Sequence, residues 1–449
     1  MTNKLWNKGH IFDKEIEKFT VGEDYLLDYK LIKYDLYGSI AHTMMLLKIN
    51  ILNKTEYAKL KKGLKNILQL DKKKKFKIAL EDEDVHTAVE NFLVGKIGIA
   101  GKKIHTGRSR NDQVSLDLKL YTKDALLEIE TAVLNLCEEM IAFAGKYENT
   151  PMPGYTHMQK AMPSSIGLWM CSFIESLLDD LELVKVAYEQ NDQNPLGSAA
   201  GYGTSIELDR EFTTELLGFK KVQNNVLYVQ NSRGKIELSV LSALNQVMQT
   251  IGKLSTDLLL FTMSEFDYFS LPEELCTGSS IMPQKKNCDC LELLKAKSAM
   301  IFGYLMQVNS IISNLPSGYS RNFQLIKKPL FEGIEMALES IDITALVVKN
   351  LVVYEDKLAS SCTNEIFAAE KAYEFVKKGI PFREAYKNVA EKIGKMEDSD
   401  VNKTILSMKT IGNTGNLGLN KLAEKIKKEK KLVLYQDNCF KKKIKNLLK

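Results

Sequence analysis

The stretch that decides the fold runs from Lys235 to Phe261 and reads KIELSVLSALNQVMQTIGKLSTDLLLF. It contains no proline, and its apolar side chains recur every three or four residues, which is the spacing of one face of an α-helix. These apolar positions are Val240, Leu244, Val247, Ile251, Leu254, Leu258 and Phe261. The stretch therefore predicts a long helix whose wide apolar stripe must be covered by other helices.

Four further segments show the same helical spacing of apolar residues, at about 118–140, 166–184, 291–312 and 330–352. Each of the five helices is roughly 25–30 residues long, which corresponds to about 40 Å at 1.5 Å per residue. Helices of this length bury their apolar stripes against one another, so we predict an all-α fold built on a long five-helix bundle. Apolar side chains on a second face, as at 258–261 and 311–312, predict an oligomer in which further helices cover them.

The length of 449 residues is enough for two or three structural parts. We place a mostly helical N-terminal domain at 1–106, the central helical bundle domain at 107–359 and a small helical C-terminal domain at 360–449. No strong alternating pattern of apolar and polar residues predicts a sheet.

Composition narrows the class of protein. Lys and Arg number 62 against 57 Asp and Glu, and a net charge of +5 is too weak to favour nucleic acid. We find no apolar run long enough for a membrane span and no signal-peptide core, so we expect no membrane partner. Seven cysteines without paired spacing favour reduced thiols and a cytoplasmic location. Cys288 and Cys290 do not have the spacing of a zinc site, and we expect no metal.

Residues 278–287, GSSIMPQKKN, form a polar run between two long apolar-periodic segments. Pro283 cannot lie inside a helix and Gly278 permits unusual backbone angles, so a loop is predicted. The loop ends just before a helix N-terminus, where backbone donors and the helix dipole favour anions. The loop either binds a carboxylate or activates a hydroxyl as a base; the alternative is an ordinary surface loop.

Three other polar clusters lie at predicted helix ends, at 105–113, 156–159 and 319–324. Successive ends of an up-and-down bundle lie at opposite ends of the molecule, so one chain would not bring all clusters together, whereas an oligomer could. The clusters offer an imidazole, hydroxyls, amides and cations, which suit a multiply charged small anion and proton transfer by side chains. As alternatives, His157 could merely pack, Arg108 and Arg110 could form surface ion pairs, and Glu292 could be an exposed helix residue.

Arginine is scarce in this lysine-rich chain. Five of its arginines lie in or beside stretches rich in Gly, Ser and Asn, namely Arg108, Arg110, Arg210, Arg233 and Arg321. A planar guanidinium suits carboxylate binding better than an ammonium does, so these positions suggest anion recognition.

These motifs resemble a known family. The loop 278–287 resembles the signature loop of the fumarase/aspartase superfamily. Its Gln-Lys-Lys variant, together with HTGRSRND at 105–112 and GYTHMQ at 154–159, resembles the argininosuccinate lyase family in particular. The resemblance continues through YSRNFQLIK at 319–327 and GIPFREA at 379–385, so it covers nearly the whole chain.

The resemblance implies reversible cleavage of argininosuccinate to L-arginine and fumarate, by anti β-elimination and without a cofactor. It also implies a three-domain, mostly helical protomer. Its central five-helix bundle would join the twenty-helix core of a homotetramer, with each site shared between three subunits.

The resemblance also assigns roles to individual residues. Ser279 would be the general base, and His157, steadied by Glu292, would be its acid–base partner. Lys285 and Asn287 would hold the carboxylate whose charge grows during proton removal. The remaining substrate-binding positions would be Ser109, Arg110, Asn111, Thr156, Tyr319, Gln324 and Lys327.

The chain differs from the family pattern at three positions. Cys288 replaces the usual proline after the signature loop, Val89 replaces an asparagine, and Asp24 stands where a substrate-binding serine is often found. We therefore assign Asp24 no substrate contact. The rival functions are another superfamily lyase, such as adenylosuccinate lyase, and a non-catalytic, crystallin-like structural tetramer. Intact Ser279, His157 and Lys285 argue against the structural role.

Overall fold

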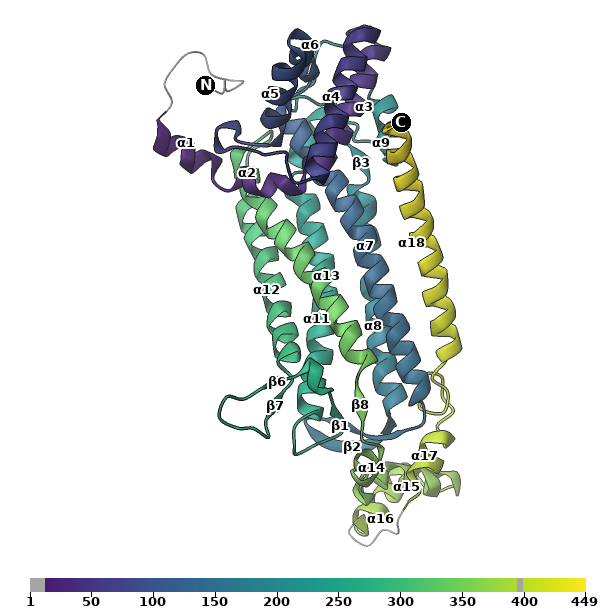
Figure 1. Cartoon of the computed structure of the whole chain (residues 1–449). Coiled ribbons are helices and arrows are strands. Elements are labelled where there is room, and N and C mark those ends of the chain that lie inside the picture. The colour runs from purple at the N-terminus through teal and green to yellow at the C-terminus, as the bar shows by residue number, and fades with distance from the viewer. Residues whose placement is uncertain (1–12, 394–398) are drawn as a thin grey trace.

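The structure is a computed structural model that describes residues 13–393 and 399–449. Long helices lie side by side and form an elongated bundle (Figure 1), which confirms the predicted all-α bundle fold. Five of them are the helices that the sequence predicted. They are α7 (Arg110–Lys146), α8 (Ile166–Asn191), α11 (Lys235–Phe261), α12 (Asp289–Ile312) and α13 (Lys327–Lys349). The first helix begins earlier than the apolar spacing indicated, because residues 110–113 form its polar first turn.

Side-chain caps fix where the bundle helices begin. The Ser109 hydroxyl accepts a hydrogen bond from the Asn111 backbone N–H, and the Ser165 hydroxyl accepts one from Leu168 N–H. Gly234 precedes α11 with a φ of 80°, a value that favours glycine, and its N–H donates to the Glu237 carboxylate. These contacts satisfy backbone donors that a helix start otherwise leaves free.

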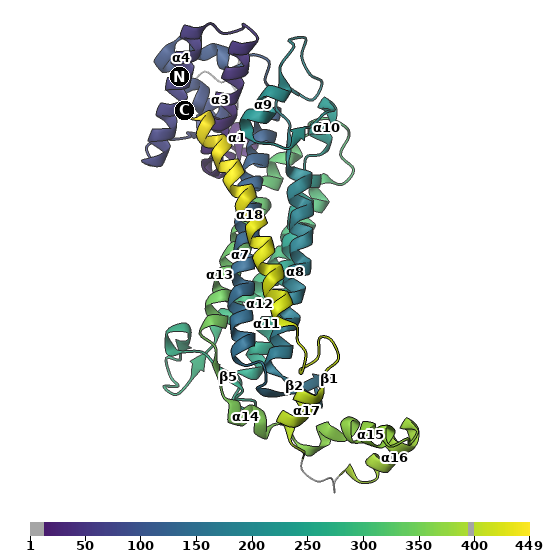
Figure 2. The same ribbon diagram turned by 90° about the vertical axis from the view of Figure 1, so that its right-hand side faces the viewer.

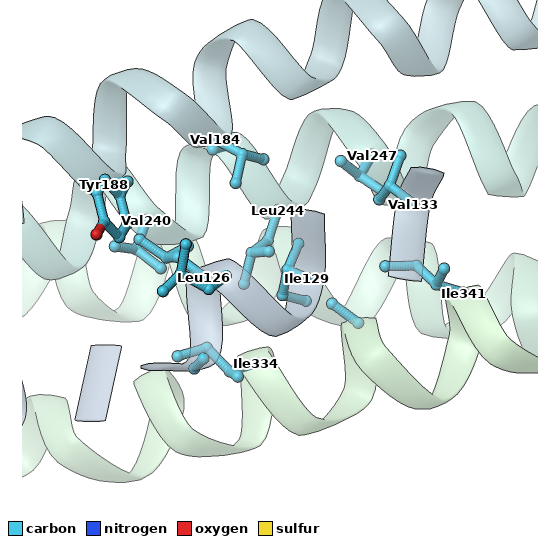
Figure 3. Packing of buried hydrophobic residues seen from close by; sticks show 14 of the residues in the cluster. Leu126, Ile129, Val133, Val184, Tyr188, Val240, Leu244, Val247, Ile334 and Ile341 are labelled. Carbon is cyan, nitrogen blue, oxygen red and sulfur yellow. The ribbon is translucent and has the colours of Figure 1, made fainter. Parts of the chain in front are cut away.

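The apolar stripes of the bundle helices meet in one continuous core (Figure 3). The labelled side chains come from α7, α8, α11 and α13 and are all buried: Leu126, Ile129, Val133, Val184, Tyr188, Val240, Leu244, Val247, Ile334 and Ile341. Burying one such aliphatic side chain contributes about 1.5–3 kcal/mol, so this core is the main source of stability for the bundle.

The N-terminal part caps the end of the bundle where α7 and α13 begin (Figure 1). It consists of short helices and 3-10 turns: α1 (Lys14–Val21), α2 (Asp24–Leu27), η1 (Asp28–Lys30), α3 (Ile32–Lys48), α4 (Lys54–Lys72), η2 (Leu80–Asp82), α5 (Val85–Ile97), α6 (Ile99–Lys102) and η3 (Lys103–His105). We call the end of the bundle where α7 and α13 begin the cleft end, after the cleft described below.

Two segments follow the last bundle helix in the chain, and the first of them lies at the opposite end of the bundle. Four short helices, α14 (Glu355–Ser360), α15 (Ala368–Lys377), α16 (Phe382–Ala390) and α17 (Val401–Ser407), lie below the bundle in Figure 1. The last helix, α18 (Leu419–Leu447), then returns along α7 to the cleft end (Figure 2). It buries Val433 and Phe440, so this part of the 360–449 range packs on the bundle.

In the described part of the chain, short strands pair in four two-stranded sheets, which the sequence did not predict. They are β1 (Pro151–Thr156) with β2 (Gln159–Ser165), β3 (Gln193–Asn194) with β4 (Lys221–Val222), β5 (Phe269–Ser270) with β8 (Val352–Val353), and β6 (Thr277–Gly278) with β7 (Lys286–Asn287). The β1–β2 and β6–β7 hairpins lie at the end of the bundle opposite the cleft end (Figure 1), which we call the hairpin end. Among the residues that the structure describes, no helix is both long and apolar enough to cross a membrane.

Close packing between α11 and α12 gives a test of the bundle. A Cβ added at Gly252 would lie 2.5 Å from Ser298 Oγ, whereas a Cβ at Gly95 on α5 would meet no atom within 4 Å. Gly252→Ala should therefore lower the melting temperature, at a cost of about 1–3 kcal/mol. Gly95→Ala, the matched control, should stabilise the protein by up to about 1 kcal/mol through helix propensity. Equal melting temperatures for the two variants at one protein concentration would contradict the packing.

Candidate active site

A cleft of about 550 Å³ lies at the cleft end, between the starts of α7 and α13 and the N-terminal helices. We call it the α7–α13 cleft. Its lining includes six of the residues that the resemblance marks as substrate-binding: Ser109, Arg110, Asn111, Tyr319, Gln324 and Lys327. Residues from two distant stretches of the sequence, 109–111 and 319–327, thus converge on one cavity, which has the mixed charge of a site for a small polar ligand.

Asp112 holds the first turn of α7 in place, although the sequence reasoning gave it no role. Its Oδ1 accepts the Ser109 N–H at 2.9 Å, and its Oδ2 accepts the N–H groups of Gly197 and Ala199, each at 3.0 Å. Burial raises the pKa of Asp112 to about 6, against the lowering effect of these backbone donors. The Ser-x-x-Asp spacing of a capping box was the available sequence signal for this residue.

The cleft also presents Arg110, which is bound to the carboxylates of Glu83 and Asp84. Its Nη1 lies 3.1 Å from Glu83 Oε2, and its Nη2 contacts Asp84. Asp84 in turn caps α5 by accepting the Thr87 N–H at 2.9 Å. The expectation of a surface ion pair is wrong for Arg108, which is buried and donates to Ser39 Oγ at 3.0 Å.

Lys327 begins α13 and is fully buried between two carboxylates. Its Nζ lies 2.8 Å from Asp24 Oδ1 and 2.7 Å from Asp28 Oδ1. Burial alone would lower the pKa of Lys327, but the two carboxylates outweigh it and raise that pKa above its ordinary value. Burial raises the pKa of Asp24 to about 6. Asp24 therefore lines the cleft and contacts a predicted substrate-binding lysine, which no local motif indicated.

Tyr319 and Gln324 lie on the loop and 3-10 turn that join α12 to α13. Tyr319 packs edge-on against Phe323, and its side chain is partly exposed at the cleft. The Gln324 side-chain amide donates to the carbonyl oxygens of Thr20 and Val21, each at 3.0 Å. These bonds anchor the turn η5 (Arg321–Ile326) to the end of α1.

The other predicted site residues lie at the hairpin end. Thr156 pairs with Gln159 across the tip of the β1–β2 hairpin, and His157 and Met158 form its two-residue turn. Both turn residues have positive φ, 51° and 61°, a backbone conformation that residues other than glycine rarely adopt. The turn thereby presents the His157 imidazole to solvent, because the residue is exposed. Strained backbone of this kind is often found where function requires it.

The signature loop is the second hairpin at this end. β6 and β7 pair through Gly278 and Lys286, and the loop between them carries Ser279 and Lys285. The Ser279 Oγ accepts backbone N–H groups of Met282 at 3.1 Å and Ile281 at 3.4 Å. Two donors aimed at one hydroxyl oxygen favour negative charge on it.

Most of the other residues of the signature loop are exposed to solvent. The Asn287 amide donates to the Gly278 carbonyl at 3.4 Å. Ile281 is 83% exposed, and Lys285 and Glu292 are exposed as well. Among the described residues, no hydrogen bond joins Glu292 to His157 within one chain. The predicted site residues thus form two groups at opposite ends of the bundle (Figure 1), as the sequence indicated.

One group of described side chains has donor atoms close enough to hold a metal ion: Asp35, His86 and Asp117. It lies where α3, α5 and α7 meet, and all three side chains are buried. His86 Nδ1 lies 2.8 Å from Asp35 Oδ1 and 3.7 Å from Asp117 Oδ2. Burial would lower the pKa of His86, but the carboxylates raise it to about 9. Burial first, and Asp35 next, also raise the pKa of Asp117 well above its ordinary value, so the cluster retains protons and His86 directs its positive charge toward Asp35, the nearer carboxylate.

Comparisons with known proteins agree with the fold, which is that of a helical-bundle lyase. The model of the lyase family matches residues 9–303. A crystal structure described as EDDS lyase in complex with formate has the same fold, with a TM-score of 0.83 and 21% sequence identity. The match covers 98% of this chain and 95% of the chain in that crystal structure. The chain is thus an enzyme of the lyase class.

Closer relatives give the family. The argininosuccinate lyase of Thermotoga neapolitana is 45% identical over 398 residues, which is 89% of this chain and 100% of that protein. The argininosuccinate lyase of Sorangium cellulosum is 41% identical over 426 residues, which is 95% of this chain and 99% of that protein. The chain belongs to the argininosuccinate lyase family of the fumarase/aspartase superfamily.

The buried His86 contact predicts a pH-dependent contribution to stability. The folded-state pKa of about 9 lies above the ordinary value of 6.5, so the contribution is complete below about pH 6.5 and lost as pH rises through 9. The difference corresponds to about 3 kcal/mol. His86→Gln should lower the melting temperature strongly at pH 6 and less at pH 9.5.

His157→Gln is the matched control, since that imidazole is exposed at a hairpin tip. It should leave the melting temperature near that of the wild type at both pH values. A His86→Gln effect that grows between pH 6 and pH 9.5 would contradict the assignment of a protonated His86.

Proposed function

We propose that this lyase catalyses the reversible anti β-elimination of argininosuccinate to L-arginine and fumarate, a step of arginine biosynthesis. The observation that carries the proposal is 41–45% identity to two argininosuccinate lyases over nearly their full length. The Gln284-Lys285-Lys286 sequence in the signature loop favours this substrate over adenylosuccinate, which is the alternative within the superfamily.

Ser279 is the proposed general base, which removes the proton from the carbon beside a succinyl carboxylate. A serine hydroxyl serves as a base only if its alkoxide is stabilised, and each lowering of the pKa by one corresponds to about 1.36 kcal/mol. The N–H groups of Ile281 and Met282, which donate to this oxygen, support that role. The ammonium group of Lys285 and the start of α12 add positive potential nearby.

His157 is the proposed proton donor to the departing guanidino nitrogen, with Glu292 orienting its ring. Anti elimination places the base and the acid on opposite faces of the breaking bond, so two groups are needed. Lys285 and Asn287 hold the succinyl carboxylate whose negative charge increases during proton removal. Thr156, beside His157 in the hairpin, contacts the same part of the substrate.

Ser109, Arg110, Asn111, Tyr319, Gln324 and Lys327 bind the rest of the substrate in the α7–α13 cleft. Their position at the cleft end, and that of the acid–base residues at the hairpin end, support a homotetramer in which antiparallel neighbours complete each site. Exposed apolar side chains along α12 offer an interface for such neighbours, namely Leu293, Met300, Phe302 and Met306. A four-fold repetition of the five-helix bundle gives the twenty-helix core.

The same proposal includes the three-domain division at 1–106, 107–359 and 360–449 and a cytoplasmic location. All seven cysteines are free thiols, which suits a reducing compartment.

Replacement of the base tests the mechanism. Purified wild-type protein should release fumarate from argininosuccinate without any added cofactor, measured by ultraviolet absorbance. Ser279→Ala should lower kcat by about 10²–10⁴-fold, the range for loss of a general base, and should leave the melting temperature unchanged.

Ser280→Ala is the matched control, because it removes the neighbouring hydroxyl from the same loop. It should retain most of the wild-type rate. A Ser279→Ala variant as active as Ser280→Ala would place the base elsewhere, and wild-type turnover of adenylosuccinate instead of argininosuccinate would overturn the substrate.

A further inference from the structure

Arg233 is a buried guanidinium at the α7–α13 cleft. The sequence marked it only as one of five arginines suited to an anion, and the family resemblance gave it no substrate contact. Arg233 directly precedes Gly234 and α11, and only 5% of its surface is exposed. It lines the cleft together with Tyr319 and Gln324. A buried cation beside an open cavity is a candidate binding group for an anionic ligand.

The hydrogen-bonding groups of Arg233 are incompletely used within the chain. Its Nε and Nη1 are buried and have no hydrogen-bond partner. The nearest carboxylate oxygen is Glu237 Oε1, 3.7 Å from Nε and beyond hydrogen-bond range, while Oε2 of that carboxylate accepts the Gly234 N–H at 2.7 Å. Buried donors without acceptors are unfavourable, and more so when they are charged.

Lys119 lies in the same region and shares the field of that carboxylate. Burial lowers the pKa of Lys119 to about 7; Glu237 raises it and Arg233 lowers it further. Glu237 therefore interacts with two buried basic groups, Lys119 and Arg233, and does not serve Arg233 alone.

Three of the other cleft cations already have acceptors within the chain, and a fourth, Lys102, is exposed. Arg110 binds Glu83 and Asp84, and Lys327 binds Asp24 and Asp28. Arg321 is exposed and donates to the Thr20 carbonyl at 2.6 Å. Arg233 differs from these three, because its buried donors lack a protein acceptor.

An aromatic ring helps to fix the guanidinium. Its central carbon lies 5.5 Å from the centroid of the Phe323 ring, which is itself buried. A cation held against a ring loses little further freedom when it binds a ligand, and a guanidinium can grip a carboxylate with two parallel hydrogen bonds.

We propose that Arg233 binds the α-carboxylate of the arginine part of the substrate, and of free arginine as product. The assignment rests on the proposed function. The succinyl carboxylates belong with Lys285 and Asn287 beside the acid–base residues. The remaining carboxylate of argininosuccinate is the one on its arginine part, and the cleft is where that part extends.

The test compares the binding of arginine with that of agmatine, which is arginine without its carboxylate, by isothermal titration calorimetry. Wild-type protein should bind arginine roughly 10–100-fold more tightly than agmatine, as expected for charge-assisted hydrogen bonds. Arg233→Gln should reduce this ratio to near one, mainly by weakening arginine. Arg233→Lys, which keeps the charge but loses the planar fork, should give an intermediate ratio.

Arg383→Gln is the control, since Arg383 is exposed on α16 at the hairpin end. It should keep the wild-type ratio. An unchanged ratio in Arg233→Gln and Arg233→Lys, or a wild-type protein that binds both compounds equally, would overturn the proposal. The binding measurement does not need turnover, so failure of the wild type to cleave argininosuccinate would count separately against the proposed function.

Discussion

The length of the bundle helices determines how far apart the two groups of predicted site residues lie. α12 has 24 residues, which corresponds to about 36 Å at 1.5 Å per residue. The signature loop precedes its first turn, and Tyr319 follows its last turn at the opposite end. No small substrate reaches from one group of residues to the other within a chain. The same long apolar faces that build the core therefore separate the two groups of predicted site residues.

At the cleft end, buried charges hold the N-terminal helices on the bundle. Lys327 joins α13 to Asp24 and Asp28, and His86 joins α5 to Asp35 and Asp117 on α3 and α7. Each pair is far apart in sequence; Asp28 and Lys327 are separated by 299 positions. Buried ion pairs add little net stability because desolvation offsets their attraction, but breaking one is costly. Their effect is to fix the cleft residues in one arrangement.

Much of the fold could be predicted because helical spacing of apolar residues is a local signal. The spacing predicts the five bundle helices, and the polar clusters at 105–113 and 319–324 do lie at helix starts, whereas 156–159 forms the tip of the β1–β2 hairpin. The β1–β2 hairpin was missed because Pro151, Pro153 and Pro163 obscure any strand pattern. The course of α18 along the bundle could not be predicted, because its partner α7 lies hundreds of positions earlier in the sequence. For the site, the capping box was a readable sign of Asp112, whereas the partners of Lys327 required the tertiary structure.

The most direct measurement of a site shared between subunits is complementation between two impaired chains. Asn111→Leu damages the α7–α13 cleft, and Ser279→Ala removes the base at the hairpin end. Co-expressed and purified as mixed assemblies, the two variants should release fumarate from argininosuccinate faster than either variant alone, because some sites combine the two intact ends. A mixture of Ser279→Ala with Lys285→Ala, both altered in one loop, should show no such recovery. Mixed Asn111→Leu and Ser279→Ala assemblies that form but stay as slow as their parents would contradict a site shared between subunits.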